Sequence, residues 1–135
     1  MKRKIEELLQ LPYWVIDILP EQVPEDSNGQ FFAVEEYFLE KKQLATIKQK
    51  HINLILKLNC YQQIFLNEEK VVNPSPEHIA EEVKNRYLYI FVNDSMILSK
   101  PDDTYMTIFN PDENLLSLIK TIALGEGLFV WKPTT

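Results

Sequence analysis

Residues 44–58, LATIKQKHINLILKL, form the stretch around which the rest of the chain must pack. Apolar residues recur there at the spacing of an α-helix, at Leu44, Ile47, Leu54, Ile55 and Leu58. The apolar surface is widened by Ala45, Ile52 and Leu56 beyond that of a helix with one buried face. We therefore expect a central helix that packs against a sheet and has other helices beside it.

The remaining segments predict further helices and strands. The predicted order is a helix at 5–11, a strand at 13–19, a helix at 28–40, the central helix, a strand at 62–67, a helix at 76–86, strands at 87–92, 95–99 and 104–109, a helix that starts from the run 110–113 and a strand at 128–132. Turn residues separate the three successive strands, which predicts an antiparallel meander. This order predicts a single-domain α+β fold, with a mixed, mostly antiparallel sheet of about five strands packed against the long central helix and further helices.

Local signals mark several helix ends. Ser75-Pro76 is a typical helix start, and so is the Asn-Pro-Asp-Glu run at 110–113, in which Glu113 takes the capping-box position after Asn110. Ser27 fits a capping box at the start of the 28–40 helix. Gly125 is expected to end the last helix in a left-handed conformation. We also expect Val71-Val72 to pair back in a short strand.

The helix at 28–40 and the central helix present their apolar residues on different faces. Phe31, Val34 and Phe38 share one face, and at helical spacing that face is out of phase with the apolar stripe of the central helix. We therefore expect a break or bend near residues 40–43, although neither proline nor glycine lies there.

The composition suits one soluble domain in a reducing compartment. The chain has 135 residues, 45% of them hydrophobic, which is enough to build a core without disulfides. Its single cysteine, Cys60, is typical of cytosolic proteins. The apolar run 11–19 contains Pro12 and Asp17 and is too short to cross a bilayer. We therefore expect a cytoplasmic protein that has no contact with a membrane.

Several common chemistries lack the residues that they need. The three glycines do not gather in one turn, as a nucleotide-binding loop requires. One cysteine and two distant histidines, His51 and His78, exclude the usual structural zinc sites. No serine lies in the strand–turn–helix motif of a hydrolase. These observations predict no metal and no cofactor, and they favour a non-catalytic binding or regulatory module.

Two ionisable residues are candidates for an acid–base site. Asp17 interrupts an apolar strand, in which alternation places it on the same face as Tyr13 and Val15. His51 lies within the apolar surface of the central helix. The alternative hypothesis is therefore a small enzyme whose catalytic acid and base are Asp17 and His51 in contact. Each could instead be a structural group, held by backbone atoms or by an opposite charge.

The charge distribution suggests a third function. The net charge is −6, but residues 41–60 contain five lysines and no acid. Lys42, Lys50 and Lys57 could contact an anion or RNA, although an acidic protein is a poor nucleic-acid binder and the lysines could equally form a solvated surface. Glu35, on the preceding helix, is likewise either a binding residue or part of a solvated surface.

The first forty residues are rich in aromatic side chains, among them Tyr13 and Trp14. From the sequence we interpret them as parts of the core. Tyrosine and tryptophan are also preferred anchors of protein interfaces. If several proved exposed, contact with a protein partner, or with a second copy of the chain, would be the better explanation.

The runs LPYWVIDILP at 11–20 and GQFFAVEEYF at 29–38 resemble a family of small uncharacterised bacterial proteins. The resemblance extends over most of the chain. It implies a free-standing cytosolic protein and assigns no catalytic or binding residue. The sequence as a whole favours a binding or regulatory module that acts through protein–protein contacts.

Overall fold

Helices and strands follow one another in the predicted order. The computed structural model describes residues 4–26, 29–67 and 73–134. The elements are α1 (Ile5–Leu8), β1 (Tyr13–Asp17), α2 (Phe31–Leu39), α3 (Lys41–Asn59), β2 (Phe65–Leu66), α4 (Pro76–Asn85), β3 (Leu88–Val92), β4 (Ser95–Ser99), β5 (Met106–Phe109), α5 (Glu113–Gly125) and β6 (Phe129–Trp131). The predicted α+β class is confirmed.

The strands form one antiparallel sheet in the order β2-β3-β4-β5-β1-β6. The sheet has six strands where the sequence predicted about five, and every pairing between neighbours is antiparallel. The predicted meander is formed by β3, β4 and β5. The first strand in the chain, β1, lies between β5 and the last strand, β6, so the two ends of the chain meet in one sheet.

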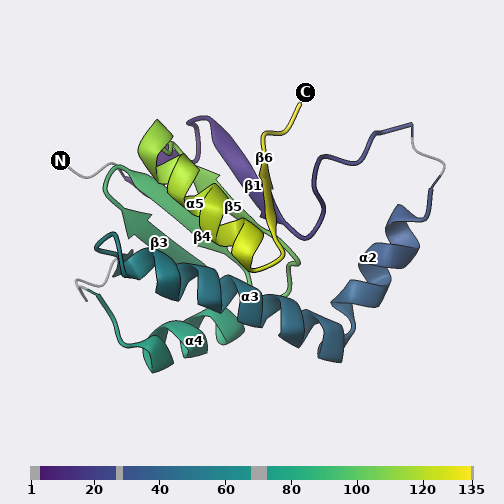
Figure 1. Ribbon diagram of the computed structural model, residues 1–135, viewed down its shortest axis with the longest axis horizontal. Helices are drawn as coiled ribbons and strands as arrows, with labels where there is room; N and C mark the ends of the chain where they lie inside the picture. Colours follow the sequence, from purple (N-terminus) through teal and green to yellow (C-terminus); the bar gives the residue numbers. More distant parts are fainter. Residues whose placement is uncertain (1–3, 27–28, 68–72, 135) are drawn as a thin grey trace.

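The hydrophobic core lies between the sheet and three helices. Helices α3, α4 and α5 cover the same face of the sheet (Figure 1). The predicted central helix, α3, contributes Ile52, Leu54, Ile55 and Leu58 to this core, all with 1% exposure or less. The expected packing of this helix against a sheet with helices beside it is confirmed.

The predicted break between the second and third helices is confirmed. Helix α2 ends at Leu39 and α3 begins at Lys41. Glu40 between them has φ −60° and ψ 142°, an extended conformation that no α-helix contains. The phase difference between the two apolar faces therefore has a structural consequence, because α2 turns away from the direction of α3 (Figure 1).

Capping residues start two of the helices, α4 at Ser75 as predicted and α5 at Asp112, two residues after the predicted Asn110. The Ser75 side chain accepts a hydrogen bond from the His78 backbone N–H, with Pro76 at the first helical position. The Asp112 side chain accepts one from the Leu115 N–H at 2.8 Å.

Other local predictions need correction. Helix α5 includes Gly125, and the residue with positive φ is Gly127, at +78°. The helix end closes around Gly127, because the Gly127 N–H donates to the Leu124 carbonyl and the Leu128 N–H donates to the Ala123 carbonyl. Helix α2 begins at Phe31, three residues later than predicted. Ser27 and Val71-Val72 lie outside the described residues.

The second face of the sheet is only partly covered. At one end α1 packs against it through Leu8, which contacts Met96 and Phe109 in a small second cluster. Near β1 and β6 no helix lies flat on this face among the described elements, and α2 stands apart from it (Figure 1). None of the helices in the described part of the chain combines the length and the apolar content needed to cross a bilayer.

Candidate functional site

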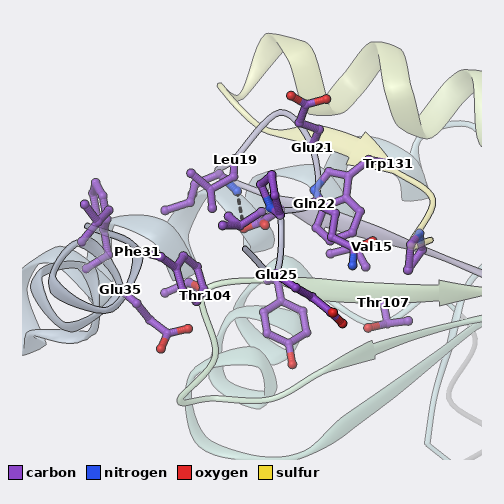
Figure 2. Close-up of a pocket in the computed structure, with 18 of the residues that line it drawn as sticks. Val15, Leu19, Glu21, Gln22, Glu25, Phe31, Glu35, Thr104, Thr107 and Trp131 are labelled. Atoms are coloured by element: carbon purple, nitrogen blue, oxygen red, sulfur yellow. Dashed lines mark hydrogen bonds between the residues drawn. The ribbon is translucent and has the colours of Figure 1, made fainter. Parts of the chain in front are cut away.

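A cavity of about 650 Å³ lies between the uncovered part of the sheet and α2. Its floor consists of side chains that alternate with the core residues of β1, β5 and β6, namely Val15, Asp17, Thr107, Phe109 and Trp131. Its walls come from the loop after β1, from Thr104 and Tyr105 before β5, and from α2 (Figure 2). The volume is typical of a site that binds a ligand or part of a partner.

Aromatic side chains from the first forty residues line the cavity. Tyr13 contacts the ring of Phe109, with 5.5 Å between ring centroids, and Phe31 and Phe38 face the cavity from α2. Phe32 also lines it and is 81% exposed. Interpreting these residues as core was wrong, because α2 is separated from the sheet and buries none of its nine residues.

Asp17 lies at the floor of the cavity and is only 8% exposed. Its Oδ1 accepts a hydrogen bond of 2.8 Å from the Ile18 backbone N–H. Burial raises the pKa of the Asp17 carboxyl, and the Glu35 charge raises it further, against the opposing effect of the Ile18 and Leu19 N–H groups and of Trp131. The structure therefore holds a carboxylate in the sheet at a cost in free energy.

Glu35 comes from the opposite wall. Its side chain extends from α2 toward the strands (Figure 2). It lies close enough to Asp17 and to Tyr105 to raise the pKa of both groups. Glu21 and Glu25, from the loop after β1, also line the cavity, and none of the described lining residues is lysine, arginine or histidine. The site is therefore both aromatic and acidic.

His51 lies on the other side of the sheet from Asp17. It is fully buried on α3, in the helical layer, and does not line the cavity. Within the described residues neither ring nitrogen makes a well-aligned hydrogen bond, although the Thr104 backbone lies close enough to interact with the ring. Burial, and then the Lys48 charge, lower the pKa of His51 to about 3, although the Thr104 backbone favours the charged form. The structure does not bring Asp17 and His51 together, so they form no joint acid–base site.

Lys48 is a buried residue that the sequence interpretation overlooked. It is 4% exposed, and its Nζ donates hydrogen bonds to the Lys100 and Asp103 carbonyls at 2.7 and 3.4 Å. Burial lowers its pKa to about 8. These bonds fix the turn that leads into Thr104 on the cavity wall. The sequence did indicate that Lys48 is buried, because it lies four residues before Ile52, on the apolar face of the same helix.

The other predicted binding residues lie away from the cavity. Lys57 forms an ion pair with Glu126, and the Lys50 charge also lowers the pKa of Glu126. Lys42 is exposed at the start of α3. The lysines of α3 therefore do not gather around one empty anion site, since two of them share a carboxylate.

Trp14 points to the opposite face of β1 from Tyr13. It packs against the main core, and the Nζ atoms of Lys120 and Lys132 lie 4.7 and 5.8 Å from its ring centroid. Of the two aromatic residues singled out from the sequence, only Tyr13 lines the cavity.

Trp131 is the cavity residue that the sequence interpretation missed. Its register opposite Val15 brings it beside Asp17 on the same face of the sheet. Its indole Nε1 is buried and makes no well-aligned hydrogen bond within the described residues, but it lies close enough to Asp17 to lower the pKa of that carboxyl. The alternation of β6 was visible in the sequence, but its pairing with β1 was not.

The fold and the cavity together define a small α+β protein with an open, acidic and aromatic site on the second face of its sheet. No group of three or more His, Cys, Asp or Glu side chains in the described part of the chain is placed to hold a metal ion. Comparison of the chain with protein-family models, with curated proteins and with solved structures gives no match.

Replacing Asp17 with asparagine is expected to stabilise the protein at pH 7. The raised pKa means that the folded state binds the proton more tightly than the unfolded state, so the stability linked to Asp17 is greatest below pH 3.8 and is lost as the pH rises through the folded-state pKa. Asparagine does not ionise, so the variant does not lose this stability as the pH rises. Its side-chain oxygen can still accept the hydrogen bond from the Ile18 N–H.

Urea unfolding of both proteins at pH 7 and at pH 4 measures this effect. The advantage of Asp17→Asn over the wild type is expected to shrink at pH 4. Asp102→Asn, at an exposed turn position, serves as the control and is expected to change stability by less than about 0.5 kcal/mol. A wild type that is more stable than Asp17→Asn at pH 7 would contradict the expectation.

Proposed function

We propose that this protein is a non-catalytic binding module that holds a segment of a partner protein in the cavity between its sheet and α2. The observation that carries the proposal is the state of α2. Six of its nine residues, in the sequence FFAVEEYFL, are large and apolar or aromatic, and none of the nine is buried.

Exposure of such a helix is unfavourable for an isolated chain. Phe32, Val34, Tyr37 and Leu39 all rank among the exposed large hydrophobic residues. A nine-residue helix is also marginal by itself and gains most of its stability from packing. Contiguous apolar surface of this kind marks interaction sites in soluble proteins. A partner that fills the cavity would cover both α2 and the open part of the sheet.

The positions of Asp17 and His51 also support binding over catalysis. The enzyme hypothesis required these two groups in hydrogen-bond contact, whereas they lie on different sides of the sheet. A carboxylate that is held at a cost in free energy, at the floor of an open cavity, suits recognition of an incoming group.

We also propose that the module acts in the cytoplasm. Cys60 is free and exposed, a state that suits a reducing compartment. The resemblance to small bacterial proteins points the same way. The acidic cavity makes nucleic acid a poor occupant, because phosphate groups would face carboxylates.

Site-specific photo-cross-linking tests the proposal. The cross-linking amino acid benzoylphenylalanine is placed at Phe32, on the cavity wall, and in a control at Tyr61, which is 69% exposed beyond the end of α3. Illumination of cells that make each variant is expected to give one adduct of defined mass for position 32 and none for position 61. The cross-linked segment is identified by mass spectrometry, synthesised and titrated with the purified chain.

The titration decides the outcome. A synthetic segment that binds one-to-one, and that binds at least tenfold more weakly to Phe32→Ser, supports the module. An adduct with twice the mass of the chain would instead show that a second copy occupies the cavity. Equal labelling from positions 32 and 61 would show that the cavity is not the site of contact.

A further inference from the structure

The charges around the cavity identify the chemistry of its occupant. Four of the described lining residues are carboxylic acids, and none carries a positive charge. The nearest lysine in sequence, Lys132, lies over the Trp14 ring on the opposite face of the sheet. The cavity therefore presents negative charge that the described residues leave uncompensated.

Asp17 and Glu35 face the same space from opposite walls. Asp17 is fixed in the sheet and nine-tenths buried, and the Glu35 side chain extends from α2 toward the strands (Figure 2). The Glu35 charge is close enough to raise the pKa of Asp17. Among the described residues no cation forms an ion pair with either group. Two carboxylates that repel each other across an apolar space are stabilised most by a cation placed between them.

The surrounding rings favour the same kind of group. Tyr13, Phe31, Tyr105 and Trp131 line the cavity around the two carboxylates. The faces of aromatic rings attract ammonium and guanidinium groups, and more strongly when water is excluded. The rings also bury the aliphatic part of a lysine or arginine side chain. A cation with an apolar stem fits both features of the lining.

We propose that the occupant is a basic segment of a partner protein, in which an arginine or lysine flanked by apolar residues places its charged group between Asp17 and Glu35. This inference rests on the proposed function. A protein segment fits better than a small amine, because the exposed apolar residues of α2 extend the contact surface beyond the cavity. A second copy fits poorly, because α2 itself carries Glu35 and Glu36 and no cation, and the chain has a net charge of −6.

A peptide-display selection tests the inference without knowledge of the partner. A library of random ten-residue peptides is selected on the immobilised full chain at physiological salt. Enriched peptides are expected to contain arginine or lysine between apolar residues. The strongest one is synthesised, together with a version in which its arginine is replaced by neutral citrulline, or its lysine by norleucine.

A double-mutant cycle then isolates the contact with Asp17. Neutralising the cation of the peptide is expected to weaken binding to the wild type roughly thirtyfold. The same change is expected to weaken binding to Asp17→Asn by twofold or less, because the partner charge is already absent. A merely structural effect of Asp17→Asn would weaken the binding of the cationic peptide and of its neutral version equally.

A matched pair on α2 provides the second comparison. Glu35→Gln is expected to weaken binding of the basic peptide roughly three- to fivefold, because Glu35 is exposed and screened. Glu36→Gln makes the same charge change on the neighbouring residue, which does not line the cavity. It is expected to leave binding within twofold.

Each outcome separates the inference from the proposed function. The basic-segment inference is overturned if the selected peptides need Phe32 for binding but contain no cation, or if Asp17→Asn does not change their affinity. Either result leaves the binding module intact. Peptides whose binding is unaffected by Phe32→Ser overturn both. Self-association of the chain that is abolished by Phe32→Ser would replace the basic segment with a second copy.

Discussion

The protein is expected to lose stability steeply in mild acid because of His51. The free energy of unfolding should fall by about 1.4 kcal/mol for each pH unit over which only the unfolded state protonates this histidine. The pKa of His51 is 6.5 in the unfolded chain and about 3 in the folded protein. Its contribution is therefore fully present above pH 6.5 and is lost progressively as the pH falls toward 3. The whole loss is at most about 5 kcal/mol, which is a large part of the roughly 5–15 kcal/mol of stability that small domains have.

His51→Leu tests the assignment. It removes the titrating group and its buried ring nitrogens, which make no well-aligned hydrogen bond among the described residues, so it should raise the free energy of unfolding at pH 7 by about 1–3 kcal/mol. His51→Leu should also make the free energy of unfolding, measured with urea, depend less steeply on pH between 6.5 and 4. His78→Gln, at the chain's other histidine on the half-exposed side of α4, should retain the steep slope. Equal slopes for the wild type and His51→Leu would show that other groups cause the acid sensitivity.

Truncation of the central helix is expected to have the second large effect. Leu54→Ala should lower the free energy of unfolding by about 2–5 kcal/mol, because Leu54 has no exposed surface and its loss leaves a cavity in the core. Leu124→Ala is the matched control, since Leu124 is a helical leucine on α5 with 64% exposure. It should cost less than about 1 kcal/mol.

Chemical unfolding of both variants at pH 7 compares them directly. The two variants should share the wild-type dependence on denaturant, so that only the midpoints differ. Similar losses for the two leucines would contradict the central position of α3. The comparison also separates burial from helix propensity, because both substitutions replace leucine with alanine in a helix.

Much of the fold could be predicted because it depends on short-range patterns. The element order, the cap at Ser75 and the break at Glu40 each follow from residues within one or two turns of each other. The cap of α5 lies at Asp112, two residues after the predicted Asn110. Their physical causes are local, since backbone geometry and side-chain capping act over a few residues. The exact ends of the helices were harder to predict. The glycine with positive φ at the end of α5 is Gly127, because the helix continues through Gly125.

The candidate site could be predicted only in part. Asp17, Tyr13 and Glu35 were identified from the sequence and all three line one cavity. Trp131 was missed because it is more than a hundred residues from Val15, its partner across the sheet. Lys48 was missed although its helical position resembles that of its buried neighbours. Its role depends on the Lys100 and Asp103 carbonyls, which the turn between β4 and β5 brings within reach.

Local patterns in the sequence specify which segments are helices and strands, which face of each is apolar, and that α3 lies at the centre. These properties depend on periodicity and on neighbouring residues. Three features depend on long-range packing: β1 lies between β5 and β6, Asp17 and His51 are on different sides of the sheet, and α2 stands apart with its aromatic residues exposed. Strand pairing and the packing of helices join residues far apart in the chain, and no local pattern specifies which distant partner each segment meets.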